Sequence, residues 1–171
     1  MQYSIFVFNR EKLGKISKEM LLNAITESNY ETLCRQYGLE PSLIEPSLNS
    51  LEVLGALNDS LSFFMVKYGE AQRRALVVQR WDAEISGGKN LIQEVIEGIN
   101  IEPLRSRLRE TRRVIEITLA PEQLKDMGLL LAYEIARWSA ERGSGIVYGL
   151  DGSWYRLNQY KAFIPIGSSG K

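Results

Sequence analysis

Two predicted β-hairpins constrain the fold of this chain more than any other feature of its sequence. Residues 146–148 and 154–157 are rich in β-branched and aromatic side chains, and Asp151-Gly152 lies between them. Asp-Gly is among the strongest short-range signals for a tight hairpin turn, because both residues tolerate a positive φ. Residues 61–68 and 74–81 form a second pair of strand-like segments around a short turn. Hairpins join antiparallel strands, so the sequence predicts a mainly antiparallel sheet.

The remaining patterns add strands and helices. Tyr3–Phe8 is apolar on both faces, which is typical of a central strand, and Arg113–Leu119 alternates as a half-buried strand does. Residues 39–60 indicate an irregular segment or a short helical turn packed on the core. Helices are expected at residues 18–25 after an N-cap at Ser17, at 30–37, at 89–99, at 103–110 and, as the longest, from Pro121 to Gly143.

This order of elements predicts an α+β fold. We expect a mainly antiparallel sheet of about five or six strands, with helices packed on one face and a long helix near the C-terminus. A length of 171 residues fits one domain, which we place at residues 1–160. The Gly- and Ser-rich end of the sequence predicts a flexible C-terminal tail at residues 161–171.

The composition narrows the classes of function. Lys and Arg together number 21, as do Asp and Glu, so the formal net charge is zero. Proteins that mainly bind nucleic acid usually carry a basic excess, so we do not expect nucleic acid as the main partner. The sequence has no histidine and one cysteine, Cys34, which excludes a Ser-His-Asp triad, an internal disulfide and the usual zinc sites. We therefore expect no cofactor, no metal site and no catalytic residues.

The sequence also bears on location. Its first residues lack a basic segment followed by an apolar stretch, so they do not have the pattern of a secretory signal. No apolar run approaches the roughly 20 residues that span a bilayer. We expect a cytoplasmic protein without a membrane partner.

Gly87-Gly88-Lys89 is a candidate anion-binding loop between a predicted strand and a predicted helix. A phosphate-binding Walker loop, however, needs a glycine five residues before the Gly-Lys pair and a Ser or Thr after it, where this chain has Ala83 and Asn90. The alternative is a turn whose glycines start a helix.

Two groups of residues are candidates for contact with a partner. Arg105, Arg109 and Arg112 share a face if residues 103–112 are helical, and guanidinium groups bind carboxylates and phosphates well. Trp154 and Tyr155 belong to an aromatic cluster near the C-terminal hairpin, which also includes Tyr148 and Tyr160. The alternatives are a solvated helix face for the arginines and cross-strand packing for the aromatic residues.

The segment from Leu129 to Leu157, LLLAYEIARWSAERGSGIVYGLDGSWYRL, resembles a pattern found near the C-termini of several small bacterial proteins. In those proteins a helix, a glycine turn, an apolar strand and an Asp-Gly hairpin follow one another. Some of them are uncharacterised, and some are immunity proteins of toxin systems. The resemblance implies a non-catalytic protein that acts by binding another protein, and it carries over no functional residue.

The favoured hypothesis is a protein-protein binding or regulatory module, similar in role to an immunity protein. The alternative is a protein or enzyme that binds a small nucleotide or phosphate ligand at Gly87-Gly88-Lys89. A third hypothesis is RNA binding through the arginines, which would depend steeply on salt concentration.

Overall fold

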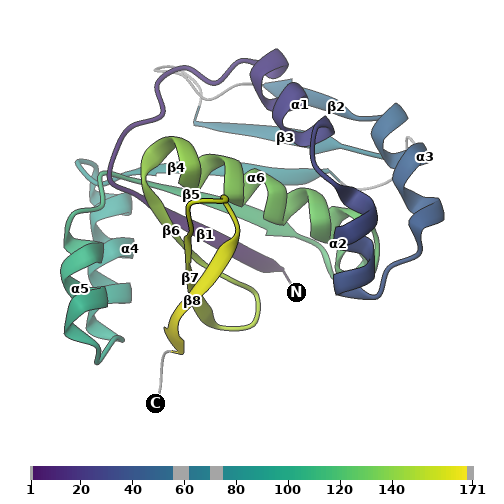
Figure 1. Cartoon of the computed structure of the whole chain (residues 1–171). Coiled ribbons are helices and arrows are strands. Elements are labelled where there is room, and N and C mark those ends of the chain that lie inside the picture. The colour runs from purple at the N-terminus through teal and green to yellow at the C-terminus, as the bar shows by residue number, and fades with distance from the viewer. Residues whose placement is uncertain (1, 56–61, 70–74, 169–171) are drawn as a thin grey trace. The chain divides into compact units, whose positions relative to one another are not determined.

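The computed structural model describes residues 2–55, 62–69 and 75–168, and for residues 167 and 168 it describes the backbone alone (Figure 1). The helices are α1 Lys18–Thr26, α2 Tyr30–Tyr37, α3 Ile44–Asn49, α4 Ser86–Glu97, α5 Glu102–Arg109 and α6 Met127–Gly143, with short 3-10 helices η1 Pro41–Leu43 and η2 Pro121–Lys125. The strands are β1 Tyr3–Asn9, β2 Glu52–Gly55, β3 Phe63–Lys67, β4 Leu76–Asp82, β5 Arg113–Leu119, β6 Gly145–Tyr148, β7 Ser153–Leu157 and β8 Phe163–Ser168.

The strands of the described residues form an antiparallel sheet, in the hydrogen-bonding order β2-β3-β4-β5-β1-β6-β7-β8. The strand pairings of the two predicted hairpins are confirmed, because β3 pairs with β4 and β6 pairs with β7, both antiparallel. The turn predicted between β3 and β4 lies largely outside the described residues. The central position predicted for the first strand is also confirmed, since β1 lies between β5 and β6. The α+β class and the antiparallel sheet therefore agree with the prediction.

The sheet has eight strands among the described residues, whereas the sequence predicted five or six. The two strands that were not predicted are β2 and β8. Phe163–Ser168 lie within the segment predicted as a flexible C-terminal tail, residues 161–171, and in the structure they form β8, which pairs with β7. Pro165 argues against a strand in this part of the sequence. Proline is nevertheless tolerated in β8, because β8 is an edge strand. Residues 169–171 lie outside the described part of the chain.

The described residues cluster into two compact units. Unit 1 consists of the described residues within Met1–Ser4, Gly14–Gln79 and Ile117–Ile135, and unit 2 of those within Ile5–Leu13, Arg80–Glu116 and Ala136–Lys171. The division passes through β1, β4, β5 and α6, so each of these elements contributes residues to both units.

Unit 1 shows how local signals set its helices. Ser17 caps α1, because its side chain accepts a hydrogen bond from the backbone N–H of Met20 at 3.2 Å. Gly38 ends α2 in the left-handed conformation with φ of 68°. The hydroxyl of buried Tyr30 donates to the carbonyl of Ile25 at 2.6 Å, which ties the start of α2 to the end of α1.

In unit 2, helices cover both faces of the sheet, which corrects the prediction that they pack on one face. A hydrophobic cluster joins α4 and α5 to Phe8 of β1 on one face. On the other face, a Cβ built at Gly145 would lie 3.1 Å from Val7 and 3.2 Å from Ala140 of α6. The physical reason is that β1 buries side chains on both faces, with Val7 at 0% and Phe8 at 1% exposure, so each face needs a cover.

No helix among the described residues is both long enough and apolar enough to cross a membrane.

Candidate functional site

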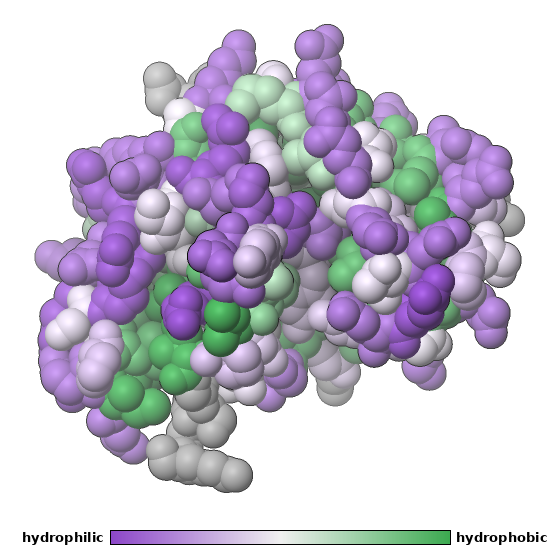
Figure 2. Space-filling model, in the orientation of Figure 1, coloured by the Kyte–Doolittle hydropathy of each residue, from purple (hydrophilic) through white to green (hydrophobic). Residues whose placement is uncertain are grey.

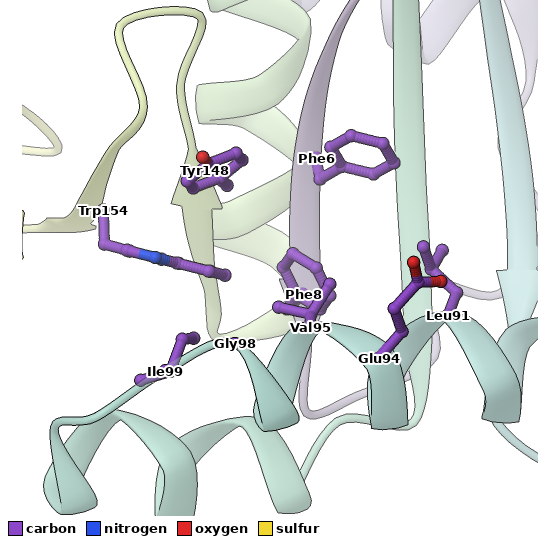
Figure 3. A pocket seen from close by; sticks show the side chains of 9 residues that line it. All are labelled: Phe6, Phe8, Leu91, Glu94, Val95, Gly98, Ile99, Tyr148 and Trp154. Atoms are coloured by element: carbon purple, nitrogen blue, oxygen red, sulfur yellow. The ribbon is translucent and has the colours of Figure 1, made fainter. Parts of the chain in front are cut away.

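Unit 2 contains a pocket between α4 and the aromatic side chains of β1, β6 and β7 (Figure 3). Its volume is about 330 Å³, at the lower end of the range for ligand pockets. The pocket is lined by Phe6, Phe8, Leu91, Glu94, Val95, Gly98, Ile99, Tyr148 and Trp154. We call it the aromatic pocket.

Strand register places three of these aromatic residues in a row. Phe6 of β1 is opposite Tyr148 of β6, and Tyr148 is opposite Trp154 of β7. Residues directly opposite in an antiparallel sheet project to the same face, so the three rings are neighbours across three strands. The ring centroids of Tyr148 and Trp154 are 4.8 Å apart. Phe8 follows Phe6 on the same face of β1, and its ring lies 5.3 Å from that of Trp154.

The opposite wall comes from one face of α4. Leu91, Glu94, Val95 and Gly98 are three or four residues apart, which places them along one side of a helix. The helix is held against the sheet by Ile92, Ile96 and other members of the hydrophobic cluster. The walls of the pocket therefore consist of aromatic rings on one side and aliphatic side chains on the other.

Two polar groups belong to this site. Glu94 is exposed and forms no ion pair with any described residue, and its carboxylate rises from α4 at the edge of the pocket (Figure 3). The indole Nε1 of Trp154 is buried and has no hydrogen-bond partner among the described residues. An apolar, ring-lined pocket with one carboxylate at its edge suits a cation on an apolar stem.

The structure places the predicted aromatic candidates on opposite sides of β7. Trp154 is 1% exposed and forms a wall of the aromatic pocket instead of an open surface. Tyr155 lies on the other side, where its ring centroid is 5.9 Å from that of Phe163 and its hydroxyl donates to Asp151. The two residues therefore do not act on a common surface.

The predicted arginine face is only partly formed. Arg105 and Arg109 both contact Glu102, with Nη1–carboxylate distances of 3.9 Å and 2.8 Å, and the pKa of the Glu102 carboxyl is lowered chiefly by its hydrogen bond from Arg109. Helix α5 ends at Arg109, so Arg112 lies beyond the helix, with its backbone N–H bonded to the carbonyl of Asn9. Contact of Arg105, Arg109 and Arg112 with a partner stays a prediction.

Gly87, Gly88 and Lys89 lie in the first turn of α4, one turn earlier than the predicted start of this helix. A Cβ at Gly88 would lie 2.1 Å from the carbonyl oxygen of Asp82, and one at Gly87 would lie 3.3 Å from the Trp81 ring. Both glycines thus allow the helix to approach the end of β4 closely. Anion binding at these residues stays a prediction.

Sequence reasoning missed Phe6 and Glu94 as site residues, and it placed Tyr148 in the aromatic cluster of the C-terminal hairpin without its neighbour Phe6. Phe6 and Tyr148 are far apart in the chain, and only the register of β1 with β6 brings them together. The sequence of α4 did contain a signal for Glu94, because this carboxylate lies beside the apolar stripe of Leu91 and Val95. Within the residues that the structure describes, no group of three or more Cys, Asp or Glu side chains could hold a metal ion.

Comparisons of the chain with protein-family models, with curated proteins and with solved structures give no match.

Proposed function

We propose that this protein is a non-catalytic binding module whose aromatic pocket accepts a cationic side chain of a protein partner. The observation that carries the proposal is the row of Phe6, Tyr148 and Trp154 facing α4, with the carboxylate of Glu94 at the edge of the pocket. The proposal keeps the hypothesis of a protein-protein binding module and assigns it to the aromatic pocket.

The chemistry of the walls selects the occupant. A lysine or arginine side chain has an apolar stem that can lie against Leu91 and Val95, and a charged end that is attracted to the faces of aromatic rings. Such a cation–π contact contributes about 0.5–2 kcal/mol, and Trp is the most effective ring. Glu94 adds an opposite charge that is not engaged in an ion pair with any described residue.

The pocket also has the features of an energetic centre in a protein interface. Such centres are enriched in Trp, Tyr and Arg, and they consist of an anchor side chain in a well-packed pocket. Packing holds two of the rings in place, because Trp154 and Phe8 are each 1% exposed and belong to the hydrophobic cluster of unit 2. A rigid pocket loses little conformational entropy when a side chain enters.

Binding in place of catalysis is supported by the residue types at hand. The sequence has no histidine, and Glu94 and Tyr148 are the ionisable groups among the described residues that line the pocket. Neither side chain forms a hydrogen bond to the other or to any other described side chain, so the pocket shows no preorganised acid–base pair, and this favours binding over catalysis.

The test uses three short peptides that differ only in a central lysine, norleucine or glutamate. Norleucine retains the apolar stem of lysine without its charge. The lysine peptide is expected to bind, with the norleucine peptide weaker by about tenfold, which corresponds to about 1.4 kcal/mol. Binding is measured by NMR titration, with the Trp154 indole N–H and the Tyr148 amide as reporters. Equal binding of the lysine and norleucine peptides would contradict the proposal.

A matched pair of variants locates the binding. Glu94→Lys places a like charge at the edge of the pocket and is expected to abolish binding of the lysine peptide. Glu97→Lys makes the same change of charge on the same helix at an exposed residue outside the pocket, and it is expected to retain binding. An unchanged affinity in Glu94→Lys would show that the peptide binds elsewhere.

A further inference from the structure

Unit 2 has a second cavity, which shares no lining residue with the aromatic pocket. Its volume is about 710 Å³, and its walls come from α5, the end of α6, the start of β6 and the β7–β8 hairpin. A cavity of this size is within the range that holds a small organic molecule. We call it the basic cavity.

Positive charge is concentrated around this cavity. Its lining includes four cationic side chains, those of Arg10, Arg107, Arg156 and Lys161, against the single carboxylate of Glu141. That carboxylate is already engaged, because it pairs with the Lys161 ammonium at 2.6 Å and with Arg137 outside the cavity. In a chain whose formal net charge is zero, such a local excess attracts anions.

Among the described residues, two of the four cations form an ion pair and two do not. Arg10 pairs with Glu110 at 2.7 Å, and Lys161 pairs with Glu141. Arg107 and Arg156, by contrast, form no ion pair with any residue in the described part of the chain.

Arg107 is the more buried of the two. Its Nη2 donates to the backbone carbonyls of Phe8 and Ser144, while its Nη1 is buried without a hydrogen-bond partner among the described residues. Burial, and to a lesser extent repulsion from Arg10, lowers the pKa of Arg107 to about 10. The negative charge of Glu110 opposes this shift. A bound anion beside the guanidinium group would offset the burial of its charge.

Much of the remaining cavity wall is apolar. Ile101, Leu104, Leu157 and Ile166 supply aliphatic surface beside the cationic groups. Figure 2 shows hydrophobic surface in the region where α5 and β8 lie in Figure 1. A fully hydrated ion such as free phosphate gains nothing from these walls, whereas a molecule with an apolar body buries them.

The backbone around the cavity is unusual as well. Ser144 and Lys161, with φ of 51° and 62°, are the two non-glycine residues with positive φ in the part of the chain that the structure describes. Both line the basic cavity. Residues other than glycine seldom adopt this backbone conformation. Those that do so occur more often at ligand sites than elsewhere.

We infer that the basic cavity binds a small amphipathic anion. Its carboxylate or phosphate group lies between Arg107 and Arg156, and its apolar body lies against Ile101, Leu157 and Ile166. Both arginines line the cavity, Arg107 as a half-buried residue and Arg156 as an exposed one. This site does not depend on the function proposed for the aromatic pocket.

The test is an NMR titration of the full chain with five probes. Octanoate and octyl phosphate carry the two possible anionic groups, 1-octanol and octylamine replace them with a neutral and a cationic group, and inorganic phosphate lacks the apolar body. Both amphipathic anions are expected to shift the amides of Ser144 and Gly145 saturably. The other three probes are expected to bind at least about tenfold more weakly, a difference of 1.4 kcal/mol or more. The tighter of the two anions identifies the preferred head group.

The test is completed by variants that are expected to retain the fold. Arg107 bonds two backbone carbonyls, so Arg156 is the better position for substitution, and Arg156→Glu is expected to weaken octanoate binding by about tenfold or more. Arg35→Glu, an exposed change outside the cavity, is the matched control and is expected to leave binding unchanged. Ile166→Trp fills the apolar side of the cavity and is expected to exclude octanoate while the charges remain.

Three results would overturn the inference. Octanol binding as tightly as octanoate would show a merely apolar cavity. Equal affinity for inorganic phosphate and octyl phosphate would show a surface charge effect without a role for the apolar walls. Shifts centred on Tyr148 and Trp154 would place the probe in the aromatic pocket instead.

Discussion

Arg113 and Asp82 form a nearly buried ion pair between neighbouring ends of β5 and β4. The Arg113 Nε lies 2.7 Å from Asp82 Oδ1, and the two side chains are only 8% and 13% exposed. Arg80 approaches the second oxygen of the same carboxylate, with a distance of 3.5 Å from its Nε to Oδ2. Asp82 therefore neutralises two guanidinium groups at the point where α4 begins.

Removal of the carboxylate is expected to destabilise the protein strongly. Asp82→Ala leaves Arg113 charged and buried without its partner, and breaking one side of a buried pair costs about 3–5 kcal/mol. The measurement is the free energy of unfolding from urea titration. Replacing both residues, as in Asp82→Ala with Arg113→Met, is expected to cost less than the sum of the two single changes. Additive effects would show that the ion pair has no energetic role.

The close approach of α4 to Asp82 gives a second prediction. Gly88→Ala would place a Cβ 2.1 Å from the Asp82 carbonyl oxygen, a backbone atom that cannot move aside as a side chain does. Overpacking of this kind costs about 1–3 kcal/mol. Gly98→Ala is the control, because its Cβ meets nothing closer than 3.6 Å and its φ of −81° suits alanine. The control is expected to be neutral or to stabilise by about 0.4–1 kcal/mol, and equal thermal shifts for the two variants would contradict this account.

Features set by neighbouring residues could be read from the sequence. The N-cap at Ser17, the left-handed end of α2 at Gly38 and the Asp151-Gly152 turn each depend on a few consecutive residues, and the structure contains all three. The strand Arg113–Leu119 was predicted with its observed bounds, because its alternation is regular.

Features set by distant contacts could not be read in this way. β2 has four residues and buries only Val53, so it offers no alternation, and its pairing with β3 is what makes it a strand. The first turn of α4 carries two glycines, which are poor helix formers, and the helix there is held by packing against Trp81 and Asp82. The aromatic pocket depends on the register of β1 with β6, which no local pattern specifies.

Unit 1 offers a third prediction in Tyr68. This residue is 1% exposed, and its hydroxyl donates to Asp126 Oδ1 at 2.6 Å, an oxygen that also accepts from the backbone N–H of Gly128 at 2.7 Å. Tyr68→Phe removes a hydrogen bond to a charged group and is expected to cost about 1.5–3 kcal/mol in the free energy of unfolding. Tyr160→Phe, at a residue that is 79% exposed, is the control and should leave stability unchanged. A loss of equal size in both variants would rule out a specific role for the Asp126 contact.

Cys34 gives the fourth prediction, which concerns pH. The thiol is fully buried, and burial raises its pKa above the ordinary value of 9.0, because the charged thiolate is disfavoured away from water. Below about pH 9 the thiol is protonated in both the folded and the unfolded chain, so its contribution to stability is fully present. Above that pH the unfolded chain releases the proton while the folded chain retains it, and stability is lost as the pH rises through the folded pKa.

The prediction is tested against Cys34→Ala, which has no group to titrate at this position. Both proteins are unfolded by urea in the presence of a reducing agent at about pH 8 and about pH 10, on either side of the ordinary thiol pKa. The other titrating groups are common to both chains, so the difference in unfolding free energy between them isolates Cys34. From the lower to the higher pH, the wild-type protein is expected to lose more unfolding free energy than Cys34→Ala does, because only the wild-type unfolded state gains a thiolate. A constant difference would mean that the thiol titrates equally in both states and that its burial has no electrostatic consequence.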